Sequence, residues 1–125
     1  MDEYSNFELP FDYSDDDKYI RAIRFNLIRP NGDIKISAFK SNKGGLSVTR
    51  SNEKYLEYAL NYMRVHFEGM MAIFPTIVCK INGIYEKHSP SEGHNLHHWE
   101  LYGDETESAL TSTQIMAIIK ECLFV

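Results

Sequence analysis

The alternation of apolar and polar residues predicts extended structure in the first third of the chain. Residues 19–29 would place apolar side chains on both faces of a strand, which is typical of a central strand in a sheet. The Pro-Asn-Gly-Asp sequence of residues 30–33 predicts a turn, because proline fixes one corner and Asn-Gly tolerates positive φ. Residues 34–39 predict a returning strand and therefore a hairpin, and residues 46–48 predict a further short strand.

Helical periodicity appears in the middle of the chain. Within residues 51–68, one helix face would carry five apolar residues, Leu56, Ala59, Leu60, Met63 and Phe67. Ser51 or Asn52 can cap the first turn, and Gly69 can end the helix.

The second half of the chain returns to strands and ends in a helix. Residues 70–81 are apolar and β-branched, which predicts a buried strand with a bulge or an edge at Pro75. Residues 84–87 and 97–102 predict two more strands, and the Thr-Ser-Thr-Gln sequence of residues 111–114 predicts a capping box that starts the last helix. This order predicts an α+β domain, with a mainly antiparallel sheet and two helices packed on it.

Length and composition narrow the class of protein. A chain of 125 residues predicts a single domain, residues 19–125, preceded by a leader of residues 1–18. Apolar runs are too short to span a membrane, and the acidic N-terminus does not resemble a signal peptide. The two cysteines form no CxxC pair, so neither a disulfide framework nor a zinc knuckle is expected. We therefore expect a cytoplasmic protein without a cofactor.

Charge is unevenly distributed between the leader and the rest of the chain. Residues 1–17 carry seven acidic residues and no basic ones, whereas residues 18–125 carry 13 basic and 11 acidic residues. Aromatic residues alternate with the acids in the leader, and this composition is typical of segments that dock on another surface. The candidate partner-binding residues are Tyr4, Phe7, Phe11, Tyr13, Asp15, Asp16 and Asp17. The leader could equally be a disordered, solvated tail or pack on its own domain.

A cluster of basic residues suggests an anion site. Residues 18–50 carry eight basic residues and one acid, and Arg24, Arg29 and Arg50 can converge if their strands share a sheet. An arginine fork matches phosphate oxygens, and the Lys-Gly-Gly sequence of residues 43–45 could bring backbone amides to the same anion. The alternative is ordinary surface arginine. Eight bases in an acidic chain make nucleic-acid binding an unfavoured reading.

Histidines gather in one part of the chain and could bind a metal. Four of the five lie within eleven residues, and His94 with His97 or His98 could approach one ion. Their spacing matches no metal motif, and the neighbours His97 and His98 would point to opposite faces of a strand. The favoured interpretation is therefore a solvated polar loop with one histidine packed on the strand, and His94 and His97 are the weak metal candidates.

Three short motifs resemble those of a small family of uncharacterised bacterial proteins. The motifs are Ser-Ala-Phe at residues 37–39, Gly-Leu-Ser-Val-Thr-Arg at residues 45–50, and His-Trp-Glu-Leu-Tyr-Gly at residues 98–103, after a first strand that carries Arg21 or Arg24. The resemblance covers roughly residues 20–105 and brings no activity with it. It implies that one polar site contains Ser37, Ser47, Arg50 and His98.

The position of Arg50 and His98 leads to a geometric prediction. Arg50 lies between a short strand and a helix, and His98 begins the last strand after a long loop, so both are expected at one end of the sheet, around one concave site. Trp99 should then point to the opposite face and into the core.

Two function classes are open from the sequence. The first is a non-enzymatic inhibitor, immunity or antitoxin protein that occupies a protein partner through its leader. A chain beginning at Lys18 should then fold but lose its partner. The alternative is a small enzyme or ligand-binding domain for a phosphate-bearing nucleotide or an RNA end. In that case Arg24, Arg50 and Ser37 would hold the ligand, and His98 or Ser47 would be the catalytic candidates.

Overall fold

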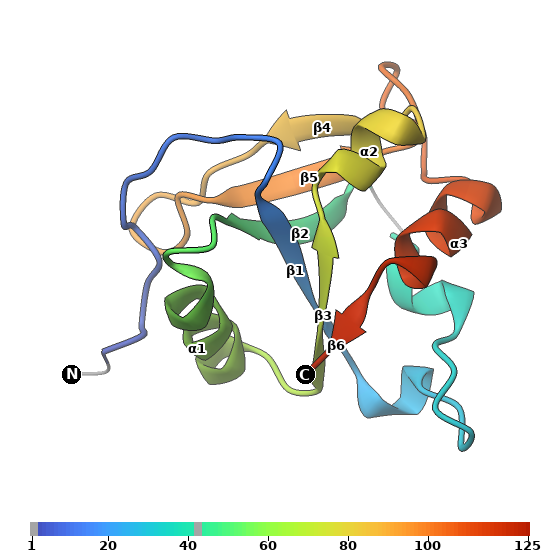
Figure 1. Ribbon diagram of the computed structural model, residues 1–125, viewed down its shortest axis with the longest axis horizontal. Coiled ribbons are helices and arrows are strands. Elements are labelled where there is room, and N and C mark those ends of the chain that lie inside the picture. Colours follow the sequence, from blue (N-terminus) through green and yellow to red (C-terminus); the bar gives the residue numbers. More distant parts are fainter. Residues whose placement is uncertain (1–2, 42–43) are drawn as a thin grey trace.

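The protein is built around one antiparallel sheet. The computed structural model describes residues 3–41 and 44–125, and within them six strands are ordered β4-β5-β2-β1-β3-β6 (Figure 1). The strands are β1 (Lys18–Ile23), β2 (Leu46–Ser51), β3 (Met70–Pro75), β4 (Tyr85–His88), β5 (His98–Tyr102) and β6 (Leu123–Phe124). The helices are α1 (Leu56–His66), α2 (Ile77–Ile81) and α3 (Ser112–Lys120), with 3-10 helices η1 (Phe25–Leu27) and η2 (Ile36–Phe39). The α+β class with an antiparallel sheet is confirmed.

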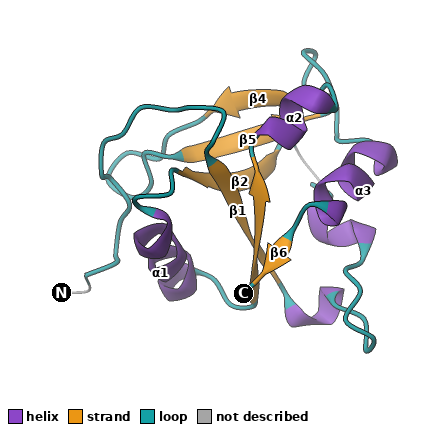
Figure 2. Cartoon of the chain, viewed as in Figure 1, coloured by secondary structure: helices purple, strands orange, loops and turns teal. Residues whose placement is uncertain are grey.

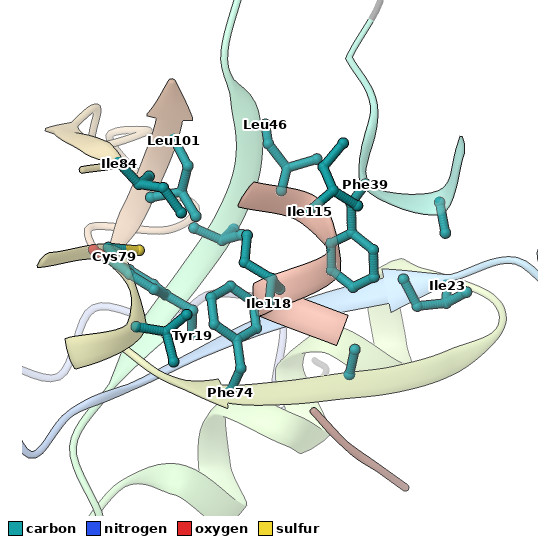
Figure 3. Packing of buried hydrophobic residues seen from close by; sticks show 14 residues of the cluster. Tyr19, Ile23, Phe39, Leu46, Phe74, Cys79, Ile84, Leu101, Ile115 and Ile118 are labelled. Carbon is teal, nitrogen blue, oxygen red and sulfur yellow. The ribbon is translucent and has the colours of Figure 1, made fainter. Parts of the chain in front are cut away.

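The two faces of the sheet are covered by different elements. Figure 2 shows α1 on one side of the strands and α2 and α3 on the other. On β1, Tyr19 and Ile23 join the core beneath α2, α3 and η2, whereas Ile20 and Ala22 pack with α1 residues. Figure 3 shows how closely Tyr19, Phe74 and Ile118 pack in the first of these cores.

The described part of the leader, residues 3–17, begins against α1 and ends on the α2 side of the sheet, where Asp15 pairs with Lys80. The Phe7 backbone N–H donates to the carbonyl of His94 (2.7 Å), and Leu96 N–H donates to the carbonyl of Phe7 (3.1 Å). The Phe7 side chain is 0% exposed and contacts residues of α1. The leader therefore contributes to the second core and pairs with the loop before β5.

The hairpin predicted after β1 is replaced by helical turns. β1 ends at Ile23, and the predicted strand over residues 34–39 is wrong because η2 occupies it. The turn itself is present, with Gly32 at φ +90°, but only an isolated bridge joins Ile28 to Ile34. The apolar residues of this segment pack against the core without pairing in the sheet. Their alternation along the sequence therefore does not indicate a strand.

The buried strand predicted over residues 70–81 is only half strand. β3 ends at Pro75, which is opposite Lys18, the first residue of its partner β1. Because β1 offers no further partner residue, the chain turns and forms α2.

The remaining boundaries follow the sequence more closely. α1 begins at Leu56, after Asn52 Oδ1 has accepted a hydrogen bond from Tyr55 N–H (2.9 Å), while Ser51 belongs to β2. The capping box of Thr111 and Gln114 is confirmed. β6, with two residues, is too short for any periodicity to indicate it.

Candidate ligand-binding groove

A groove runs between α1 and the sheet. Its first part, of about 380 Å³, we call the apolar half. Its lining residues are Arg21, Ala22, Ser47, Val48, Thr49, Tyr62, Met63, Phe67, Ser91, Asn95 and His98. Its second part, of about 660 Å³, we call the polar half. The residues that line it are Arg21, Ala22, Arg24, Phe25, Asn26, His66, Phe67, Glu68 and Gly69. The halves adjoin because both are lined by Arg21, Ala22 and Phe67.

Arg21 sits where the two central strands separate. β1 pairs with β2 only over Lys18–Ile20, so the carbonyls beyond that point lack a strand partner. Arg21 Nε donates to the carbonyl of Ala38 and Nη1 donates to the carbonyl of Ser47, both at 2.9 Å. The side chain therefore bridges the split between the strands, and Arg21 lines both halves of the groove.

The charge of Arg21 is not neutralised by the protein. Within residues 3–41 and 44–125, no carboxylate forms an ion pair with it. Burial lowers the pKa of the Arg21 guanidinium to about 10, so the group stays cationic at pH 7. Its Nη2 has no hydrogen-bond partner among the described residues. A partly buried cation of this kind is stabilised by an added anion.

Two further polar groups of the apolar half are available to a ligand. Tyr62 is only 5% exposed, and its hydroxyl has no partner in the described part of the chain. Burial raises the pKa of Tyr62, so the hydroxyl remains protonated and can donate. His98 Nδ1 lies 2.8 Å from the carbonyl of Ser89, and since a carbonyl only accepts, the neutral ring leaves Nε2 as an acceptor.

Neighbouring polar residues fix the wall of this half. Asn95 Nδ2 donates to Thr49 Oγ1 (2.9 Å), and Asn95 Oδ1 accepts from His97 N–H (3.0 Å). Thr49 Oγ1 in turn donates to the sulfur of Met63 (3.3 Å). These bonds tie the loop before β5, β2 and α1 together, so the groove is a preformed feature.

Several predicted site residues meet in the groove. Ser47 and His98 line the apolar half, and Arg24 lines the polar half. Ser37 is exposed on η2, outside both halves, next to the Ala38 carbonyl that binds Arg21. The Lys-Gly-Gly segment predicted to bring backbone amides to an anion, residues 43–45, begins outside the described residues, because Lys43 is not among them.

Arg50 does not join His98, and the prediction that they share one site is wrong. Thr49 is opposite His98 in the β2–β5 register, so Arg50 points to the other face of the sheet. There it is 7% exposed, and its Nε donates to Asp17 Oδ2 (2.9 Å). Trp99 points away from His98, as predicted, and packs half-buried against the core. It shares its side with Arg50, contrary to the prediction, with Arg50 Cζ 4.8 Å from its ring centroid. Arg50 is thus a structural residue.

The histidine candidates are separated as well. His94 is exposed, whereas His97 is buried between the hydroxyl of Tyr13 (2.7 Å from Nδ1) and the carbonyl of Leu9 (2.6 Å from Nε2). Burial lowers the pKa of His97, which keeps the ring neutral. The described residues contain no group of three or more His, Cys, Asp or Glu that could hold a metal ion.

The candidate leader residues divide between interior and surface. Phe7 and Asp17 are buried. Tyr4, Phe11 and Tyr13 are half-buried. Asp15 and Asp16 are exposed, together with Glu3 and Asp12. Only Asp15 of these exposed acids forms an ion pair, with Lys80, among the described residues.

Three groove residues are not predicted as site residues from the sequence. Tyr62, His66 and Phe67 all come from the last two turns of α1 and the residue after it. The helical pattern predicts Phe67 in the core, but it is 49% exposed because the helix ends at His66. No motif distinguishes a groove-lining tyrosine from an ordinary core tyrosine.

Comparison with protein-family models, with curated proteins and with solved structures found no match to this chain. The resemblance to a bacterial family therefore stays a prediction. Within the described ranges, no helix combines the length and apolar character needed to cross a bilayer.

Proposed function

We propose that this protein binds a small anionic ligand in the groove between α1 and the sheet. The observation that supports this most directly is the cationic Arg21, which lines both halves without a carboxylate partner among the described residues. Arg24 adds a second positive charge to the polar half. An arginine pair suits a phosphate group, because the Arg24 fork can bind two oxygens and Nη2 of Arg21 is left to donate to a third.

The test uses the full chain and pyrophosphate as the probe, with sodium sulfate and sodium chloride at matched ionic strength as references. A ligand at 100 times its dissociation constant stabilises a protein by roughly 2.7 kcal/mol, which a thermal unfolding experiment detects. We expect pyrophosphate to raise Tm and Arg24→Gln to reduce that rise. Arg24 is exposed, so this variant should fold normally. The matched control is Arg29→Gln, since Arg29 is also exposed but lies outside the groove. Equal Tm in all salts, or equal responses of both variants, would contradict the proposal.

A second candidate function is the binding of a basic protein partner, in the manner of an inhibitor, immunity or antitoxin protein. Four exposed acids on the ordered leader favour it: Glu3, Asp12, Asp15 and Asp16. Such a preorganised acidic surface speeds association with a basic surface.

The second candidate is tested by neutralising the surface without removing the buried leader residues. Affinity purification from the native host would compare the wild type with a triple variant, Asp12→Asn, Asp15→Asn and Asp16→Asn. A true partner should be lost in the variant and at high salt. Identical recovery from both proteins would exclude a role of these acids.

A further inference from the structure

The two halves of the groove differ in chemistry and meet at one cation. The apolar half has walls of Val48, Met63 and Phe67, whereas the polar half contains Arg24, Asn26, His66 and Glu68. Arg21 lies at the junction and contributes to both. An occupant that uses the whole groove therefore needs an anionic part and an apolar part joined by a short connection.

The apolar half also contains two polar groups with which a bound ligand would form hydrogen bonds. The free Tyr62 hydroxyl offers a donor, and His98 Nε2 offers an acceptor. Each end of the Asn95 amide already makes one hydrogen bond inside the protein, so this residue fixes the wall. A planar ring with a donor and an acceptor on its edge would satisfy both free groups, whereas a hydrocarbon chain would leave them unpaired.

Aromatic residues border the polar half. Phe67, 49% exposed, lines both halves and is available to a base in the apolar half, whereas Phe25, 68% exposed, lines the polar half alone. Exposed aromatic rings beside arginines are typical of sites that stack nucleobases, because every base has a π-face. Glu68 is the one acid of this half, so the two arginines leave it with a net positive charge.

On the basis of the proposed anion site, we infer that the ligand is a nucleotide, with its phosphate at Arg21 and Arg24 and its base in the apolar half. The base packs against Met63 and Phe67, and its polar edge meets Tyr62 and His98. The sugar spans the junction. The halves, of about 380 and 660 Å³, are in the range of sites for small organic ligands. A bare phosphate would leave the apolar half and its two hydrogen-bonding groups unused.

Isothermal titration of the full chain with four kinds of probe tests the inference. The probes are the four ribonucleoside 5′-monophosphates, the matching nucleosides, ribose 5-phosphate and pyrophosphate. At least one nucleotide should bind about tenfold more tightly than ribose 5-phosphate, which is the gain expected from one stacked base. It should also bind more tightly than its nucleoside, which lacks the phosphate.

Three variants separate the parts of the site. Tyr62→Phe removes only a hydroxyl that has no partner among the described residues, so folding should be unchanged. This variant should weaken binding of the nucleotide but not binding of ribose 5-phosphate. Arg24→Gln should weaken binding of the nucleotide and of ribose 5-phosphate but not binding of the nucleoside. Glu68→Gln should strengthen binding of the nucleotide and of ribose 5-phosphate, because it removes a negative charge from the polar half. Tyr85→Phe and Arg29→Gln are the controls, since neither residue lines the groove.

The outcomes distinguish this inference from the proposed function. If pyrophosphate binds in an Arg24-dependent way and no nucleotide binds more tightly than ribose 5-phosphate, the nucleotide is excluded and the anion site stands. Nucleotide binding that Tyr62→Phe leaves unchanged would place the base elsewhere and overturn the inference. Absence of binding by every probe would overturn both.

Discussion

At the scale of single residues, the most instructive side chain is Arg50. It is a candidate ligand residue by sequence, yet Asp17, the carbonyl of Ser14 and the ring of Tyr19 surround it. Phosphate-binding arginines and arginines that pair with a buried acid look the same in a sequence. What distinguishes Arg21 is the absence, among the described residues, of any carboxylate beside it.

The first prediction concerns the ion pair between Arg50 and Asp17. Asp17→Asn should lower the free energy of unfolding by about 3 kcal/mol, because it leaves a buried guanidinium without its nearest acid. Glu86, whose Oε1 is 3.9 Å from Arg50 Nη1, limits the loss. Urea unfolding measures the loss in the free energy of unfolding. Asp16→Asn is the matched control, since Asp16 is exposed, and a loss as large in the control would show that the pair is not the cause.

A second prediction follows from the lowered pKa of His97. The folded protein binds a proton at this ring less readily than the unfolded chain, where the pKa is about 6.5. Between those two pKa values the unfolded state carries more protons, so the free energy of unfolding falls as pH drops from 7.5 to 5.5.

The measurement compares urea unfolding at these two pH values for the wild type, His97→Gln and His94→Gln. The wild type and His94→Gln should lose more stability at pH 5.5 than His97→Gln, because His94 is exposed and His97 is buried. Equal losses in all three proteins would mean that His97 does not control the pH response.

At the scale of elements, the leader follows one of the alternatives that the sequence leaves open, since it packs on its own domain. A chain beginning at Lys18 was expected to fold normally, but the leader supplies Phe7 to the core and pairs with residues 94–96. Asp17 adds the buried partner of Arg50. The leader is thus part of the domain that it precedes.

The third prediction tests this role of the leader. Phe7→Ala should lower the free energy of unfolding by about 3–5 kcal/mol, as expected for an aromatic ring removed from a core. Phe25→Ala, at a side chain that is 68% exposed, should change it by less than about 0.5 kcal/mol. Similar values for both in urea unfolding would mean that the leader is detached in solution.

The elements also show what sequence could and could not predict. The capping box at Thr111, the turn at Gly32 and the apolar face of α1 were predictable, because local side-chain chemistry determines them. The end of β3 at Pro75 was not, since it depends on where the partner strand begins. For the site, Arg24 and His98 were found by residue type, and Ser47 was found through the Gly-Leu-Ser-Val-Thr-Arg motif. The face of Arg50 required the register between β2 and β5.

At the scale of the whole molecule, the leader and the groove share a boundary. The His66 ring, which lines the polar half, donates from Nε2 to the carbonyl of Ser5 (2.8 Å). Asn95, which lines the apolar half, pairs with Phe7 through a parallel bridge. Both halves of the groove are therefore positioned in part by the leader.

The last prediction is that leader docking and ligand binding are coupled. Tyr58 donates from its hydroxyl to the carbonyls of Glu3 (3.0 Å) and Asn6 (3.3 Å), and Tyr58 itself lines neither half of the groove. Tyr58→Phe should loosen the leader and weaken pyrophosphate binding by about fivefold, the lower end of typical coupling between sites. Because coupling is reciprocal, saturating pyrophosphate should slow hydrogen exchange at the Phe7 amide, which donates to His94. Tyr85→Phe, outside the groove and the leader, should change neither quantity. If Tyr58→Phe binds pyrophosphate like the wild type and exchange at Phe7 is unaffected by the ligand, the groove is independent of the leader.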